Sequence, residues 1–206
     1  GTAGATVGHG LSVSPDLVLT KQRTGVYSWH VFGDSLGVDN YLKLDTTNAQ
    51  GNVSGYFPLP SSSVVNFGST VSPATNGSST DYIAYCFHSV DGYSKVGSYT
   101  GDGLVSGATG TFVFCGFRPA FILIKAAGLV RGWQLQDSKR SVFNGQGSRL
   151  EPNSSGAEST NSTTHVIDFL SNGFKLRHQD NDINAQNQEY IFYAIAENPF
   201  KHTNAR

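Results

Sequence analysis

The chain contains little charge and no long apolar run. Charged residues make up 14% of its 206 residues, and the formal net charge is -1. A chain with so little net charge has no long-range field that would attract a phosphate backbone or an anionic lipid surface. No run of about 18 apolar residues is present, so we expect no helix that spans a bilayer. Nucleic acid and membrane insertion are therefore excluded from the expected partners.

Cysteine is scarce and methionine is absent. Cys86 and Cys115 lie in apparent strands, and we expect two buried free thiols, with a single disulfide as the alternative. No CxxC pair and no Cys/His spacing indicates zinc, so no metal and no cofactor are expected. The start at Gly1, the lack of methionine and the lack of a signal peptide favour a fragment of a longer polypeptide.

With few ions available, Ser, Thr, Asn, Gln and Gly must cover the surface. Hydrophobic residues amount to 38% and aromatic residues to 12%, and there are 24 glycines. This balance is typical of extracellular β proteins rather than of cytoplasmic enzymes.

Two similar stretches lie 104 positions apart. SPDLVLTK at 14–21 matches RPAFILIK at 118–125, and the only two tryptophans, Trp29 and Trp133, have the same spacing. Further along, DYIAYCFH at 81–88 matches EYIFYAIA at 189–196, now 108 positions apart. The chain therefore reads as a tandem duplication, with copies at about 8–95 and 112–201.

Each copy reads as β structure. Short runs rich in β-branched and aromatic residues are bounded by Pro and Gly, and SNG at 171–173 predicts a tight hairpin turn. No sustained helical period with caps is present. We expect an all-β fold, a β-sandwich or jelly-roll built from the duplication, in which 1–206 form one domain with pseudo-twofold symmetry.

No catalytic constellation stands out. GxSxG, HExxH and phosphate-loop patterns are all missing. The candidate carboxylates for glycoside hydrolysis are Asp34, Asp45, Glu151 and Asp168, but their spacing selects no pair. We therefore expect a protein that is not an enzyme.

An acidic segment at 178–189 partly resembles a calcium loop. Asp180, Asp182 and Asn184 stand at alternate positions, but the Gly and the bidentate Glu of an EF-hand are missing. The matching segment of the first copy, SPATNGSSTD at 72–81, carries almost no acid. We favour a solvated polar hairpin tip over a metal site.

Aromatic and amide side chains suggest carbohydrate recognition. Trp29 and Trp133 form either two symmetric stacking platforms or two core anchors. Gln134 is expected to face water with Gln136, and tyrosines in Gly/Ser-rich loops are expected to be exposed. Our candidate ligand-binding residues are Trp29, His30, Asp34, Trp133, Gln134, Arg140, Tyr93 and Tyr99, and Tyr56 is a further exposed-tyrosine candidate.

Several separated stretches, in order, resemble a known module. GHGLSVSPDLVLTKQR, WHVFGDSLGVDNYLKLDTT, STDYIAYCFHSVDGYSKVGSYTGDG, IDFLSNGFKLR and YIFYAIAENPFKHTNAR are similar to a module at or near the carboxyl end of tail-fibre and tailspike-like proteins of marine and environmental tailed bacteriophages. The resemblance covers nearly the whole chain, and it carries no catalytic set.

The resemblance implies a virion protein of the tail fibre, located outside the host cell, that attaches the particle to a bacterial surface. Its implied partner is a surface polysaccharide or an outer-membrane protein, and such fibres are commonly homotrimers. The alternatives are a glycan depolymerase of the tailspike type and a purely structural or trimerisation module.

Overall fold

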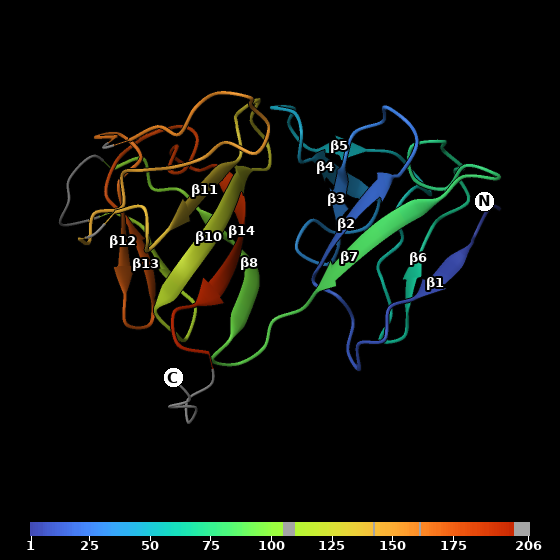
Figure 1. The fold of residues 1–206 in the computed structure, drawn as a ribbon, viewed down its shortest axis with the longest axis horizontal. Helices are drawn as coiled ribbons and strands as arrows, with labels where there is room; N and C mark the ends of the chain where they lie inside the picture. Colours follow the sequence, from blue (N-terminus) through green and yellow to red (C-terminus); the bar gives the residue numbers. More distant parts are fainter. Residues whose placement is uncertain (105–109, 142, 161, 200–206) are drawn as a thin grey trace. The chain divides into compact units, whose positions relative to one another are not determined.

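A computed structural model describes residues 1–104, 110–141, 143–160 and 162–199 (Figure 1). Every regular element in these ranges is a β-strand, which confirms the predicted all-β class. In the same ranges, no helix is both long and apolar enough to cross a bilayer. Instead of the single domain expected for 1–206, the chain forms two compact units, Gly1–His88 and Ser89–Arg206.

The first unit consists of two sheets. The larger sheet has the order β5-β4-β3-β2-β7, and the smaller one pairs β1 with β6. Its core contains Val18, Phe32, Phe57 and Val65, which come from both sheets and from the loop before β6. The bounds are β1 (Thr6–Gly8), β2 (Leu17–Gln22), β3 (His30–Phe32), β4 (Asn40–Lys43), β5 (Gly51–Asn52), β6 (Val64–Asn66) and β7 (Tyr82–Phe87).

The second unit is also a pair of sheets. One has the order β11-β10-β14-β8 and the other β12-β13-β9. A separate apolar core includes Ile124, Phe174 and Phe192, each less than a twentieth exposed. The bounds are β8 (Ser94–Thr100), β9 (Phe112–Phe114), β10 (Pro119–Ala126), β11 (Gln134–Asp137), β12 (Ile167–Leu170), β13 (Gly173–Leu176) and β14 (Glu189–Ala196).

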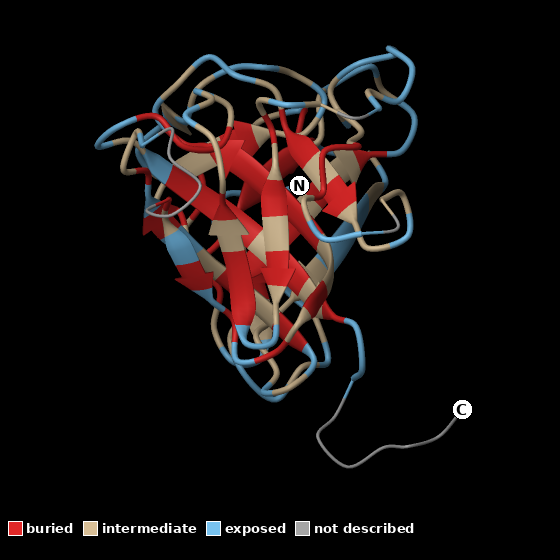
Figure 2. Ribbon diagram, turned by 90° about the vertical axis from the view of Figure 1, so that its left-hand side faces the viewer, coloured by how far each residue is buried: buried red, intermediate tan, exposed pale blue. Residues whose placement is uncertain are grey.

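Burial follows the strands in both units. Figure 2 shows that the strands carry most of the buried residues and that the loops are mainly intermediate or exposed. The apolar runs of β10 and β14 are interior strands of their sheet, as their near-continuous hydrophobicity requires. The predicted hairpin at 171–173 is confirmed, because Leu170 pairs with Gly173 across the turn from β12 to β13.

The two units repeat the same strand pairing in the same register. Leu19 of β2 lies opposite Val31 of β3, and Leu123 of β10 lies opposite Leu135 of β11, 104 positions later. On the other side of these strands, Leu19 faces Tyr85 of β7, and Leu123 faces Tyr193 of β14. Residues that are 104 or 108 positions apart in the sequence therefore occupy equivalent paired positions in the two units.

A tyrosine fixes the same turn in both units. The Tyr82 hydroxyl accepts the Gly77 N–H at 2.6 Å and donates to the Pro73 carbonyl at 2.6 Å. The Tyr190 hydroxyl accepts the Ala185 N–H at 2.8 Å and donates to the Asn181 carbonyl at 2.8 Å. These two partners lie 108 positions after Gly77 and Pro73. This shared anchor confirms that 72–77 and 180–185 are counterparts.

One strand departs from the predicted copies. The sequence placed the end of the first copy at about residue 95, but β8 (Ser94–Thr100) pairs along its length with β14 of the second unit. The second unit therefore has an extra edge strand, which lies before β9 in the chain. The pseudo-twofold relation between the copies stays a prediction.

Candidate functional site

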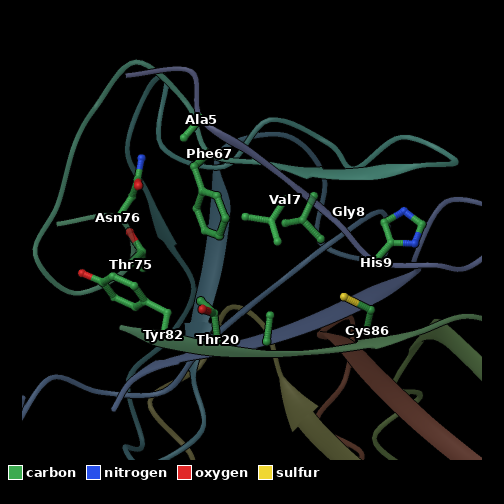
Figure 3. Close-up of a pocket in the computed structure, with 12 residues that line it drawn as sticks. Ala5, Val7, Gly8, His9, Thr20, Phe67, Thr75, Asn76, Tyr82 and Cys86 are labelled. Carbon is green, nitrogen blue, oxygen red and sulfur yellow. The ribbon is translucent and has the colours of Figure 1, made fainter. Parts of the chain in front are cut away.

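A pocket of about 380 Å³ opens in the first unit between the small sheet and the strands β2 and β7. This volume lies within the range of about 300 to 1,000 Å³ that is usual for ligand sites. Figure 3 shows Tyr82, Thr75 and Asn76 gathered at one end and His9 and Cys86 at the other. The lining residues are Ala5, Val7, Gly8, His9, Thr20, Val65, Phe67, Thr75, Asn76, Tyr82, Ala84 and Cys86.

Four polar side chains of this pocket, those of His9, Thr20, Asn76 and Tyr82, have hydrogen-bond partners within the chain. Nδ1 of His9 accepts the Leu11 N–H at 3.1 Å, so Nε2 carries the proton and donates to the Ser61 carbonyl at 3.0 Å. Thr20 Oγ1 donates to the Ile83 carbonyl, and Asn76 Nδ2 donates to a backbone carbonyl near the amino terminus. What the pocket offers a ligand is therefore mainly aromatic and methyl surface.

The other face of β7 carries an exposed aromatic pair. The rings of Trp29 and Tyr85 are stacked, with centroids 6.1 Å apart and planes 24° from parallel. Tyr85 is 46% exposed, and Ile83, two residues before it on the same face, is also exposed. Trp29 is half-buried, because one side of its indole lies against Tyr85. This pair is the open stacking surface of the first unit.

The structure does not repeat this platform in the second unit. Trp133 is 1% exposed and its backbone N–H donates to Asn153 Oδ1, so the prediction of two symmetric platforms is wrong and the core-anchor alternative holds for this residue. Gln134 and Gln136, expected to face water, are each 1% exposed. Gln136 Nε2 donates to the His165 carbonyl at 2.7 Å, whereas the buried Oε1 of Gln136 has no hydrogen-bond partner among the described residues.

Other candidate residues are also buried. His30 lies in the core among Tyr41, Tyr56 and Phe57, with ring centroids 5.3 to 6.0 Å away, and burial lowers its pKa. Tyr99, expected in an exposed loop, is a core residue of β8. The same correction applies to Tyr56, which packs against Phe57 with centroids 4.2 Å apart.

The remaining candidates are at least partly exposed. Asp34 is exposed in the loop after β3, and Tyr93 is 38% exposed just before β8. Arg140 is engaged in two ion pairs, with Asp137 at 2.6 Å and Glu158 at 2.7 Å. Of the eight candidates, Trp29 joins an exposed aromatic stack, with Tyr85. Sequence reasoning missed its partner Tyr85, although it lies three residues after Tyr82 in a recognised strand.

Two of the candidate carboxylates form ion pairs. Asp168 lies 3.2 Å from Arg177 Nε, and Glu151 lies 3.3 Å from an Arg149 nitrogen. In these contacts both carboxylates face an arginine of their own unit.

An imidazole lies between two carboxylates in the second unit. His165 Nε2 is 3.1 Å from Asp182 Oδ2 and 3.2 Å from Asp180 Oδ1, and Arg131 Nε approaches Asp182 at 4.0 Å. The acidic segment is thus not a solvated tip throughout, since Asn184 is fully buried. Imidazole nitrogen and carboxylate oxygens are ligands that divalent cations use, and in this cluster the ligand atoms of His165, Asp180 and Asp182 all lie within 4.8 Å of one another. The guanidinium of Arg131 adds a positive charge beside Asp182.

Comparison with known proteins identifies the family. The model of DUF7483, a domain of unknown function, matches residues 1–199, and the chain therefore belongs to that family. No curated protein and no solved structure matches the chain.

Proposed function

We propose that this chain is a non-catalytic receptor-binding module, which attaches a phage tail fibre to a bacterial surface glycan. The observation that carries the proposal is the exposed stack of Trp29 and Tyr85. Flat aromatic rings with a polar edge are the side chains on which sugar rings stack, and both tryptophan and tyrosine are enriched at binding surfaces for that reason. The phage context comes from the sequence resemblance alone.

The fibre context makes a weak site sufficient. Several copies of a module on one particle raise the effective affinity without any new contact, because each later binding event is intramolecular. A shallow aromatic platform with few hydrogen-bond donors suits such multivalent attachment. An extracellular location and a homotrimeric fibre are part of this proposal.

The test is binding of the purified chain to extracted surface polysaccharide and to intact bacteria, followed by measurement of polymer length. We expect saturable binding that leaves the polymer length unchanged. Trp29→Ala should reduce binding at least about tenfold, the usual scale for losing a central aromatic contact. Phe143→Ala removes another exposed aromatic ring, in the second unit, and should bind like the unaltered chain.

Each other result contradicts part of the proposal. Shortened polymer would identify a depolymerase. Binding that Trp29→Ala leaves unchanged would place the glycan elsewhere, and the absence of binding to cells and polysaccharide would favour a structural module.

A further inference from the structure

The second unit shows what would fill the pocket of the first. Its equivalents of Thr20, Thr75 and Ala84, at offsets of 104, 108 and 108, are the larger residues Ile124, Ile183 and Phe192. All three belong to the close-packed core of the second unit. The same space that is core in one unit is therefore lined by smaller side chains and open in the other.

A tyrosine from an added strand completes that core. Tyr99 of β8 lies opposite Tyr190 in the β8–β14 register, and their rings stack with centroids 5.0 Å apart and planes 10° from parallel. The Tyr99 hydroxyl donates to the Ile183 carbonyl at 2.7 Å. One strand thus supplies backbone pairing at the sheet edge and a phenol ring to the interior.

The first unit has no counterpart of β8 among the described residues. There β7 is the last strand of its sheet, whereas its equivalent β14 is covered by β8. Tyr82, the equivalent of Tyr190, lines the pocket, and Ala84 beside it is exposed. Among the described residues, no strand pairs with the outer edge of β7, and no aromatic ring takes the place over Tyr82 that Tyr99 takes over Tyr190. Open sheet edges of this kind are templates for strand addition.

We propose that the edge of β7 and this pocket form a docking site for an extended, tyrosine-bearing strand from outside residues 1–88, with the tyrosine directed into the pocket. The strand pairs antiparallel with β7, its phenol ring stacks on Tyr82, and its hydroxyl donates to the Thr75 carbonyl, as Tyr99 does to Ile183. The apolar lining provides the favourable surface for the ring, and the backbone pairing sets the register.

The geometry also specifies the residue two positions before the tyrosine. In the second unit this residue is Gly97, and a Cβ built there would lie 3.1 Å from the Phe192 ring. Ala84 replaces that ring in the first unit. The docked strand can therefore carry a side chain larger than glycine at this position, unlike β8 itself.

This site is separate from the proposed glycan surface. Successive side chains of a strand point to opposite faces, so Ala84 and Tyr85 of β7 face different sides of the sheet. The tyrosine of the docked strand enters the pocket side of the sheet, while the residue paired with Tyr85 lies on the face of the Trp29–Tyr85 stack. The two proposals have different readouts, Cys86 alkylation and polysaccharide binding, so their failures are distinguishable.

The thiol of Cys86 lines the pocket and reports its occupancy. The experiment measures alkylation of Cys86 in the full chain, with and without a peptide of sequence SKVGSYTGDG, which is that of residues 94–103. At saturating peptide we expect the alkylation rate to fall about tenfold, as for a site occupied nine-tenths of the time. The buried thiol of Cys115 must stay unreactive, which shows that the peptide does not open the second unit.

Two matched controls define the contact. The same peptide with Tyr99→Ala should give no protection, and its Gly97→Val version should protect at least as well as the original. In the protein, Ala84→Phe introduces the ring on which Gly97 packs in the second unit, so it should keep protection by the original peptide and abolish protection by the Gly97→Val version.

Protection that survives the peptide's Tyr99→Ala change, or protection by tyrosine amide equal to that by the peptide, would overturn the proposal. So would the absence of protection at millimolar peptide. Because the peptide comparison uses the unaltered chain, it decides the question even if the Ala84→Phe variant does not fold.

Discussion

Lys21 and Lys125 make the same two hydrogen bonds one repeat apart. Lys21 Nζ donates to the carbonyls of Gln22 at 2.7 Å and Gly25 at 2.8 Å. Lys125 Nζ donates to the carbonyls of Ala126 at 2.7 Å and Leu129 at 3.2 Å, which lie 104 positions after Gln22 and Gly25. In each unit, an ammonium group closes the turn that follows the second strand of the repeat. Lys125 is fully buried, whereas Lys21 is partly exposed.

Lys125 should make stability depend on pH. Burial lowers its pKa to about 8, although Asp182 acts in the opposite direction. An unfolded lysine titrates near 10.4, so between these values the unfolded chain binds more protons and stability rises with pH. We expect the free energy of unfolding of the unaltered chain, relative to Lys125→Met, to increase from pH about 7.5 to 9.5 in denaturant titrations. A difference independent of pH would contradict this assignment.

The two turn-holding tyrosines should differ in their contribution to stability. Tyr190→Phe leaves the Ala185 N–H without its hydroxyl partner in a buried site, which should cost about 1 to 3 kcal/mol. Tyr82→Phe removes the same bonds beside an open pocket, where water replaces them, and should cost less. Equilibrium unfolding of both variants tests the order, and a larger loss for Tyr82→Phe would show that the turns are not equivalent.

The two thiols should differ in reactivity. Burial raises the pKa of Cys115 to about 12, with Lys95 opposing part of the shift. Burial also raises the pKa of Cys86, but this thiol is only half-buried and lines the pocket. We expect iodoacetamide at pH about 8.5 to label Cys86 well before Cys115, since the thiolate is the nucleophile. Peptide mass spectrometry measures both, and the reverse order would contradict the pocket's accessibility.

The two tryptophans should separate stability from binding. Trp133→Ala empties a fully buried site and should lower the free energy of unfolding by about 3 to 5 kcal/mol. Trp29→Ala should have a much smaller effect on unfolding, because the indole is partly in solvent, while it weakens polysaccharide binding. Equal destabilisation by both substitutions would indicate that Trp29 is a second core anchor.

The sequence predicted pairing better than it predicted exposure. The spacings of 104 and 108 map the residue pairs of β2 with β3 and β7 onto those of β10 with β11 and β14, because strand pairing follows the copied pattern. Arg118, directly before β10, forms an ion pair with Glu197, with Nε 2.8 Å from Oε2. Gln134 and Gln136 could not be placed, because alternating glutamines resemble a solvent face unless their buried partners, Asp182 and the His165 carbonyl, are known.

The strand β8 was missed for a different reason. Its sequence, SKVGSYT, is rich in Ser and Gly, which have low strand propensity and indicate a loop when taken alone. Pairing with β14 and insertion of Tyr99 into the core override that local preference. The pocket was invisible for the same reason, since it exists only where this strand has no counterpart.

The turn held by tyrosine has a consequence for how such a chain can diverge. A side-chain oxygen at its first position, Ser72 or Asp180, accepts the N–H two residues later, and the tyrosine hydroxyl secures the rest. The residue at the third position, Ala74 or Asp182, does not support the backbone through its side chain. The same backbone turn therefore carries a buried alanine in the first unit and a partly exposed acid in the second, so a duplicated gene can acquire an ionisable group at this position in one copy alone.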